Sequence, residues 1–188
     1  MDVTRDEAKE LLEAIQEVRA QTRRRIAHGG GPYYMMIWGA VCFFGYLGSQ
    51  FLSEKTAGMV WTALAIPGMV ISALVGARLS KRVRRPRYDA RVGLFWLALL
   101  AYSALIIRLT GTASDPILKS FIVALFAMLG YVVMGLWLWA PLAWIGLAVT
   151  VVGTLGYLFI PGYFCLLMAL MGGGTIFLSG LYILRNWG

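Results

Sequence analysis

Hydrophobic residues run through this chain in long blocks, which short polar or proline-containing turns separate. From Ser120 to Leu184 there is no Asp, Glu, Lys, Arg or His. A helix in a water-soluble fold needs polar side chains on its outer face, whereas about 20 apolar residues are enough to cross a bilayer. The pattern therefore predicts an all-α, polytopic membrane protein.

The turns divide the apolar sequence into six predicted spans. They contain SEKT at 53–56, a basic segment with Pro86, TGTASDP at 110–116, Pro141, and the pair Pro161-Gly162. We expect a six-transmembrane-helix bundle with spans at about 34–52, 58–79, 92–110, 117–137, 142–160 and 163–184. Residues 1–31 precede this membrane domain of 32–188 as an amphipathic cytoplasmic helix and a glycine-rich linker.

The N-terminal segment carries the signals of a helix over about 4–28. Thr4 and Glu7 form a capping box, and Gly29-Gly30-Gly31-Pro32 marks the end of the helix. Small and apolar residues recur every three or four positions, a stripe made of Ala8, Leu11, Ile15, Val18 and Thr22. An isolated helix would expose this stripe, so we expect it to pair with a second copy or a helical partner. Binding to the membrane surface or packing back on its own loop are the alternatives.

The positive charges predict the orientation of the chain. Segment 78–91 holds seven Lys or Arg residues and one acid. With the N-terminus inside, fourteen of the 17 Lys and Arg residues lie on the cytoplasmic side and three lie outside. Cytoplasmic loops favour Lys and Arg. We therefore expect a multi-pass protein of the cytoplasmic (plasma) membrane with both termini in the cytoplasm.

The basic loop at 80–91 is the largest concentration of charge in the chain. We interpret it as an orientation signal that also attracts anionic headgroups. A specific acidic headgroup or protein partner is the alternative, bound by Arg82, Arg84, Arg85 and Arg87. Nucleic acid is not expected as a partner, because so short a membrane-tethered loop has no folded reading element.

The sequence offers no catalytic constellation. His28 is the single histidine, Cys42 and Cys165 fall at different depths, and no Asp or Glu lies within a predicted span. Catalysis within the bilayer needs a nucleophile, a base or metal-binding acids there. We therefore expect no enzyme, metal site or cofactor. Arg108, near the end of the third span, would snorkel to the interface or pair with Asp115.

Two spans contain helix-breaking residues. Pro67 and Gly68 lie in the middle of the second, and Gly172, Gly173 and Gly174 lie in the sixth. Such breaks can mark a transport site, or they can be kinks that the packing accommodates. Gly68, Ser72 and Gly76 also form a small-residue face that permits close helix approach, either within the chain or at a subunit seam.

These features favour a non-enzymatic membrane protein. We expect a regulatory or scaffold module that self-associates, or binds a partner, through its N-terminal helix. The alternative is a small channel or transporter for a neutral or apolar solute, which would use the broken helices two and six.

Overall fold

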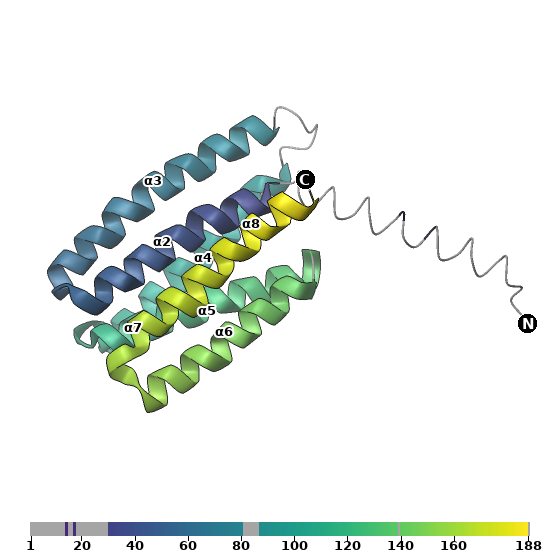
Figure 1. The fold of residues 1–188 in the computed structure, drawn as a ribbon. Helices are drawn as coiled ribbons and strands as arrows, with labels where there is room; N and C mark the ends of the chain where they lie inside the picture. Colours follow the sequence, from purple (N-terminus) through teal and green to yellow (C-terminus); the bar gives the residue numbers. More distant parts are fainter. Residues whose placement is uncertain (1–13, 15–16, 18–29, 81–86, 139, 188) are drawn as a thin grey trace, which may run out of the picture.

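The computed structural model describes Ala14, Glu17 and residues 30–80, 87–138 and 140–187, and all regular structure in this part of the chain is helical (Figure 1). The α-helices are α2 (Gly31–Phe51), α3 (Glu54–Ser80), α4 (Arg87–Leu109), α5 (Pro116–Leu138), α6 (Ala140–Phe159), α7 (Phe164–Leu167) and α8 (Thr175–Trp187). Two short 3-10 turns, η1 (Thr112–Ser114) and η2 (Pro161–Tyr163), lie between them. A π-helix, η3 (Met168–Gly174), joins α7 to α8, so that the three form one continuous final helix.

The helices pack side by side around α2 and the final helix. α3 packs on α2, and α2 packs on α7, η3 and α8. α5 and α6 pack against each other, and α4 lies on α5. Figure 1 shows α3 along one edge, α2 and α8 in the middle, and α6 along the opposite edge. α2 and the final helix are antiparallel, because Pro32 lies against Gly180 while Gln50 bonds to Leu166.

Five helical stretches are long and apolar enough to cross a membrane, by length and composition. They are Glu54–Leu79, Arg91–Leu109, Pro116–Trp137, Ala140–Phe159 and Pro161–Asn186. The prediction of an all-α chain with membrane-spanning helices is confirmed to that extent. The first predicted span, 34–52, forms α2, which is not among these five stretches. Six crossings therefore remain a prediction.

The described helix ends differ from the predicted span ends at the basic loop. α3 continues to Ser80, and α4 begins at Arg87, which the sequence pattern placed in the loop at 80–91. Pro86 directly precedes this start in the sequence.

Large apolar side chains cover the outward faces of the peripheral helices α3 and α4. Ile66 and Leu74 on α3 are 53% and 55% exposed, and Leu97 on α4 is 59% exposed. Soluble monomers rarely expose apolar surface on this scale. Lipid tails solvate such faces, whereas water does not.

A backbone-to-backbone contact joins α2 to the final helix. A Cβ added to Gly39 would lie 2.5 Å from the Phe177 backbone nitrogen, and one added to Gly173 would lie 2.6 Å from the Phe43 Cα. The contact is reciprocal. Gly39 faces Phe177, four residues after Gly173, and Gly173 faces Phe43, four residues after Gly39. Association in lipid depends on van der Waals packing, and glycine lets the backbones meet.

The buried core surrounds this contact. Phe164, Met168 and Ala169 are 0–2% exposed. They belong to a cluster of buried residues that includes Met128 of α5 and Val149 of α6. The Phe121 and Tyr157 rings stack at 4.5 Å beside Phe164, which Phe121 meets edge-on at 5.8 Å. The final helix therefore contributes the largest share of the buried side chains in this core.

The π-helix coincides with the three consecutive glycines of the final helix. The Thr175 N–H donates to the carbonyl of Leu170, five residues earlier, as π geometry requires. Glycine costs about 1 kcal/mol per residue in an α-helix relative to alanine, so this stretch holds α geometry weakly. The contact of Gly173 with Phe43 lies within it. The packing against α2 and the weak preference of glycine for α-helical geometry thus both act on the π-helix.

We predict that Gly173→Ala destabilises the protein and that Gly174→Ala does not. The methyl group of an alanine at position 173 would overlap the Phe43 backbone, and such overpacking costs about 1–3 kcal/mol. A methyl on Gly174 meets its nearest atom, the Ala169 carbonyl oxygen, at 3.7 Å, which is ordinary contact. Thermal unfolding in detergent, followed by tryptophan fluorescence, measures both variants. Equal midpoints for the two variants would contradict the close contact.

Candidate functional site

Gln50 joins the end of α2 to the start of the final helix. Its Nε2 donates to the Gly162 carbonyl over 2.8 Å, and its Oε1 accepts from the Leu166 N–H at 3.1 Å. The first N–H groups of a helix lack partners within that helix. Tyr163, the N-cap of α7, provides no side-chain bond, so Gln50 caps α7 from another helix.

A second polar link ties α2 to α3 at the same end of the bundle. The Trp61 Nε1 donates to the Ser49 hydroxyl at 2.9 Å, and that hydroxyl donates to the Gly45 carbonyl at 3.0 Å. The Trp61 ring meets the Tyr46 ring edge-on at 5.1 Å. A Cβ on Gly45 would come within 2.8 Å of the indole, so glycine provides the space for it.

Charged residues complete this end. Lys119 Nζ bonds to Glu54 Oε1 at 2.6 Å, which links the first turns of α3 and α5. Asp115 caps α5 by accepting from the N–H groups of Ile117 and Leu118, both at 3.0 Å. The pairing of Arg108 with Asp115 considered from the sequence is not formed, because within the described ranges the ion pair is Glu54–Lys119. The carboxylate of Asp115 is engaged by backbone donors instead.

The two predicted helix breaks have different structures. α3 runs through Pro67 without interruption, and Pro67 itself is exposed. In the final helix, Gly172, Gly173 and Gly174 form the end of the π-helix. The structure does not bring the two breaks together. Gly68 of α3 faces Val41 of α2, whereas Gly173 of the final helix faces Phe43 of α2. α3 and the final helix are different packing partners of α2.

The small-residue face of α3 lies against α2 within the chain. A Cβ on Gly68 would lie 3.1 Å from Val41 Cγ2, and one on Gly76 would lie 2.9 Å from the Tyr34 hydroxyl. Ser72, between them, has a buried hydroxyl without a hydrogen-bond partner. The sequence suggested either a contact within the chain or a subunit seam, and the contact with α2 lies within the chain.

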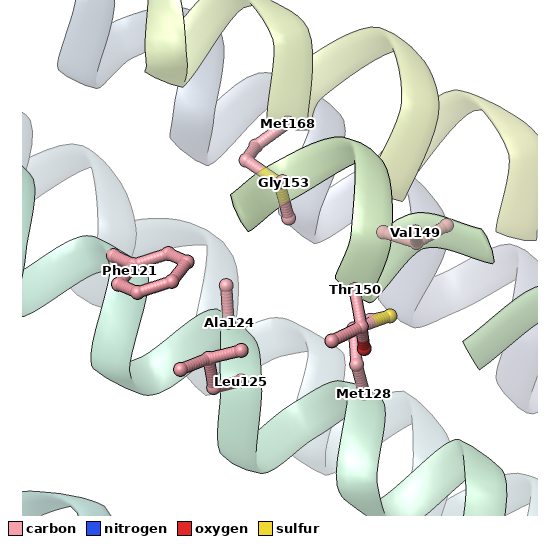
Figure 2. Close-up of a pocket in the computed structure, with 8 residues that line it drawn as sticks. All are labelled: Phe121, Ala124, Leu125, Met128, Val149, Thr150, Gly153 and Met168. Carbon is pink, nitrogen blue, oxygen red and sulfur yellow. The ribbon is translucent and has the colours of Figure 1, made fainter. Parts of the chain in front are cut away.

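The space between α5, α6 and the final helix is nearly filled. A cavity of about 10 Å³ remains, which is at the lower limit for one water molecule. Figure 2 shows Met168 beside Gly153, with Phe121 and Met128 approaching from α5. Thr150 is the one lining residue with a side-chain hydroxyl, and it donates to the Gly146 carbonyl at 2.8 Å. The cavity is therefore apolar.

A larger hollow, of about 330 Å³, opens to the outside between α6 and α8. Its lining surface is mostly apolar and includes three hydroxyl-bearing residues of α8. The lining residues are Ile145, Thr175, Leu178, Ser179, Tyr182 and Ile183. We call it the α6–α8 groove.

Most of the sequence-predicted contact residues lie outside the described part of the chain. This holds for the N-terminal stripe of Ala8, Leu11, Ile15, Val18 and Thr22, and for Arg82, Arg84 and Arg85. Arg87 is the first residue of α4. The expected roles of both segments stay predictions.

Within the described ranges, no three His, Cys, Asp or Glu side chains gather at one point. Cys42 and Cys165 are both free thiols. The expectation of a chain without metal, cofactor or catalytic site stays a prediction.

Sequence reasoning missed Gln50 and Gly39, which make contacts across the bundle. Gln50 had a usable signal, since an amide side chain at the end of an apolar span seeks hydrogen-bond partners. Gly39 had none, because the chain holds 22 glycines and local sequence does not say which one faces another backbone.

We predict that Gln50→Leu lowers the free energy of unfolding by about 1–2 kcal/mol, since it removes a helix cap and a second hydrogen bond. Thr62→Val is the matched control, because the Thr62 hydroxyl bonds only to the Gly58 carbonyl of its own helix. Denaturation in detergent compares the two variants. A Gln50→Leu protein as stable as the control would show that the cap contributes nothing.

Searches against protein-family models, curated proteins and solved structures returned no match to this chain.

Proposed function

We propose that the chain is an integral protein of the cytoplasmic membrane that crosses the bilayer six times. It acts without catalysis, as a scaffold or regulatory module that associates with a second copy or a helical partner through its N-terminal helix. The following observations support the proposal.

The position of α2 supports a sixth crossing. It is 21 residues long, enough to span the hydrocarbon core, and it lies between α3 and the final helix. A helix enclosed by other helices meets little lipid, so it tolerates glycines and polar groups such as Ser49 and Gln50.

The distribution of charge supports the orientation. Six crossings bring both termini and the basic loop to one side of the membrane. That side carries fourteen Lys and Arg residues, including Arg185 at the end of α8, against three on the other. The positive-inside rule then places these termini in the cytoplasm.

The apolar stripe on the N-terminal segment is the observation that carries the association role. Gly30 has φ 84°, a left-handed conformation, so the helical path of α2 does not extend backward through it. α2 therefore starts at Gly31, and we propose the helix that the sequence predicts over 4–28 as a separate element. Its first half is acidic, which disfavours an anionic membrane surface and favours a protein partner.

The close packing inside the bundle favours a scaffold function over a channel or transporter. Gly173 is closed against the Phe43 backbone, and the space beside Met168 is smaller than most water sites. A closely packed bundle is suited to holding a cytoplasmic helix at the membrane.

We predict that deleting residues 1–27 reduces the assembly to a single chain or abolishes capture of the helical partner, because the stripe is lost. Particle mass in detergent and pull-down from solubilised membranes are the measurements. Leu11→Asp with Ile15→Asp should reproduce the deletion, since both residues lie on the stripe. Glu10→Gln with Glu13→Gln, off the stripe, is the matched control. Unchanged mass and capture in the deletion would remove the association role.

A second candidate function is a small channel or transporter for a neutral or apolar solute. The π-helix favours it, since π segments are rare and occur frequently at functional sites. Solute flux into proteoliposomes, compared with protein-free vesicles, separates the candidates. Flux that survives deletion of residues 1–27 would support transport over association.

A further inference from the structure

The α6–α8 groove has the dimensions of one leaflet. Thr175 lies close to the middle of the span Pro161–Asn186. From Thr175 to Ile183 the groove follows α8 over nine residues, whose ends are about 12 Å apart at a rise of 1.5 Å per step. Half of a hydrocarbon core of roughly 30 Å is about 15 Å. The groove therefore runs from near the bilayer centre to the headgroup level of one leaflet.

The interfacial end of the groove carries a positive charge. Leu178, Tyr182 and Arg185 follow one another at helical spacing, so Arg185 lies one turn beyond the groove on the same face of α8. Arg185 is exposed, and the structure gives it no ion pair among the described residues. On α6, the 69% exposed Trp144 precedes the lining residue Ile145. Tryptophan favours the headgroup level of a membrane.

The polar groups of the groove are hydrogen-bond donors without acceptors. Thr150 and Thr154 on α6 each bond to a carbonyl of their own helix at 2.8 Å. The hydroxyls of Thr175 and Ser179 make no such bond within the described chain. An unpaired hydroxyl in an apolar medium costs free energy, so a ligand with acceptors is favoured here.

We propose that the α6–α8 groove binds one anionic phospholipid. Its acyl chain lies along Ile145, Leu178 and Ile183, and its ester oxygens accept hydrogen bonds from Ser179 and Tyr182. Its phosphate pairs with Arg185. A phospholipid combines hydrogen-bond acceptors, a negative charge and an apolar chain, and the groove and its interfacial end present hydroxyl donors, the cation Arg185 and apolar side chains. This site is distinct from the basic loop at 80–91 and goes beyond the association role.

Native mass spectrometry of the full chain with phosphatidylglycerol or phosphatidylcholine of matched chain length tests the site. The unaltered protein should retain one phosphatidylglycerol in preference to phosphatidylcholine. Arg185→Gln should lower phosphatidylglycerol affinity about fivefold and remove the preference, since one arginine near an anionic surface contributes on that order. Ser179→Leu should lower retention of both lipids, because the larger side chain fills the groove.

Matched variants keep the outcomes distinct. Arg108→Gln, an exposed cation at the far end of α4, and Thr62→Leu, an outward hydroxyl on α3, should leave lipid retention unchanged. Arg185 is on the surface, so Arg185→Gln remains informative even if Ser179→Leu does not fold. Retention unaffected by Arg185→Gln would overturn the proposal. The proposal would also be overturned if the lipid were lost only when Arg82, Arg84, Arg85 and Arg87 are all replaced by Gln. A Ser179→Leu protein that keeps its lipid but falls from a dimeric to a monomeric mass would assign the groove to a second copy instead.

Discussion

The bundle depends on the reciprocal backbone contact between α2 and the final helix. Lipid tails are as apolar as the side chains, so the helices gain no hydrophobic free energy by leaving lipid for one another, and they associate through close packing and hydrogen bonds. Gly39 opposite Phe177 and Gly173 opposite Phe43 bring two backbones together at the centre of the molecule. The remaining helices pack outward from this pair, with α3 on α2 and with α5 and α6 on the final helix.

Polar interactions reinforce that contact at one end of the bundle. Gln50 caps α7, Ser49 accepts from Trp61, and Lys119 pairs with Glu54. The ion pair is partly exposed and contributes about 0–1 kcal/mol, whereas Gln50 satisfies a backbone donor that lipid would leave unpaired. The α6–α8 groove lies at the other end of the bundle.

The sequence predicted the helices better than their partners. Uninterrupted apolar blocks indicate spans because lipid leaves few alternatives for the backbone, and the glycine spacing of Gly68 and Gly76 indicated a close contact. The neighbour of each helix was not predictable, because periodicity is local and a glycine on one helix does not name the backbone it meets. For the same reason Asp115 was a candidate partner of Arg108, yet it caps α5. The three glycines 172–174 indicated an interruption, but a π-helix and a kink look alike in sequence.

The central claim is that α2 crosses the membrane as the helix around which the others pack. Cysteines introduced at His28 and at Ser53, on either side of α2, test it most directly in a chain with Cys42→Ala and Cys165→Ala. A membrane-impermeant maleimide applied to intact cells should label position 53, and position 28 should react only after the membrane is opened. Labelling of both positions from the same side would contradict the account.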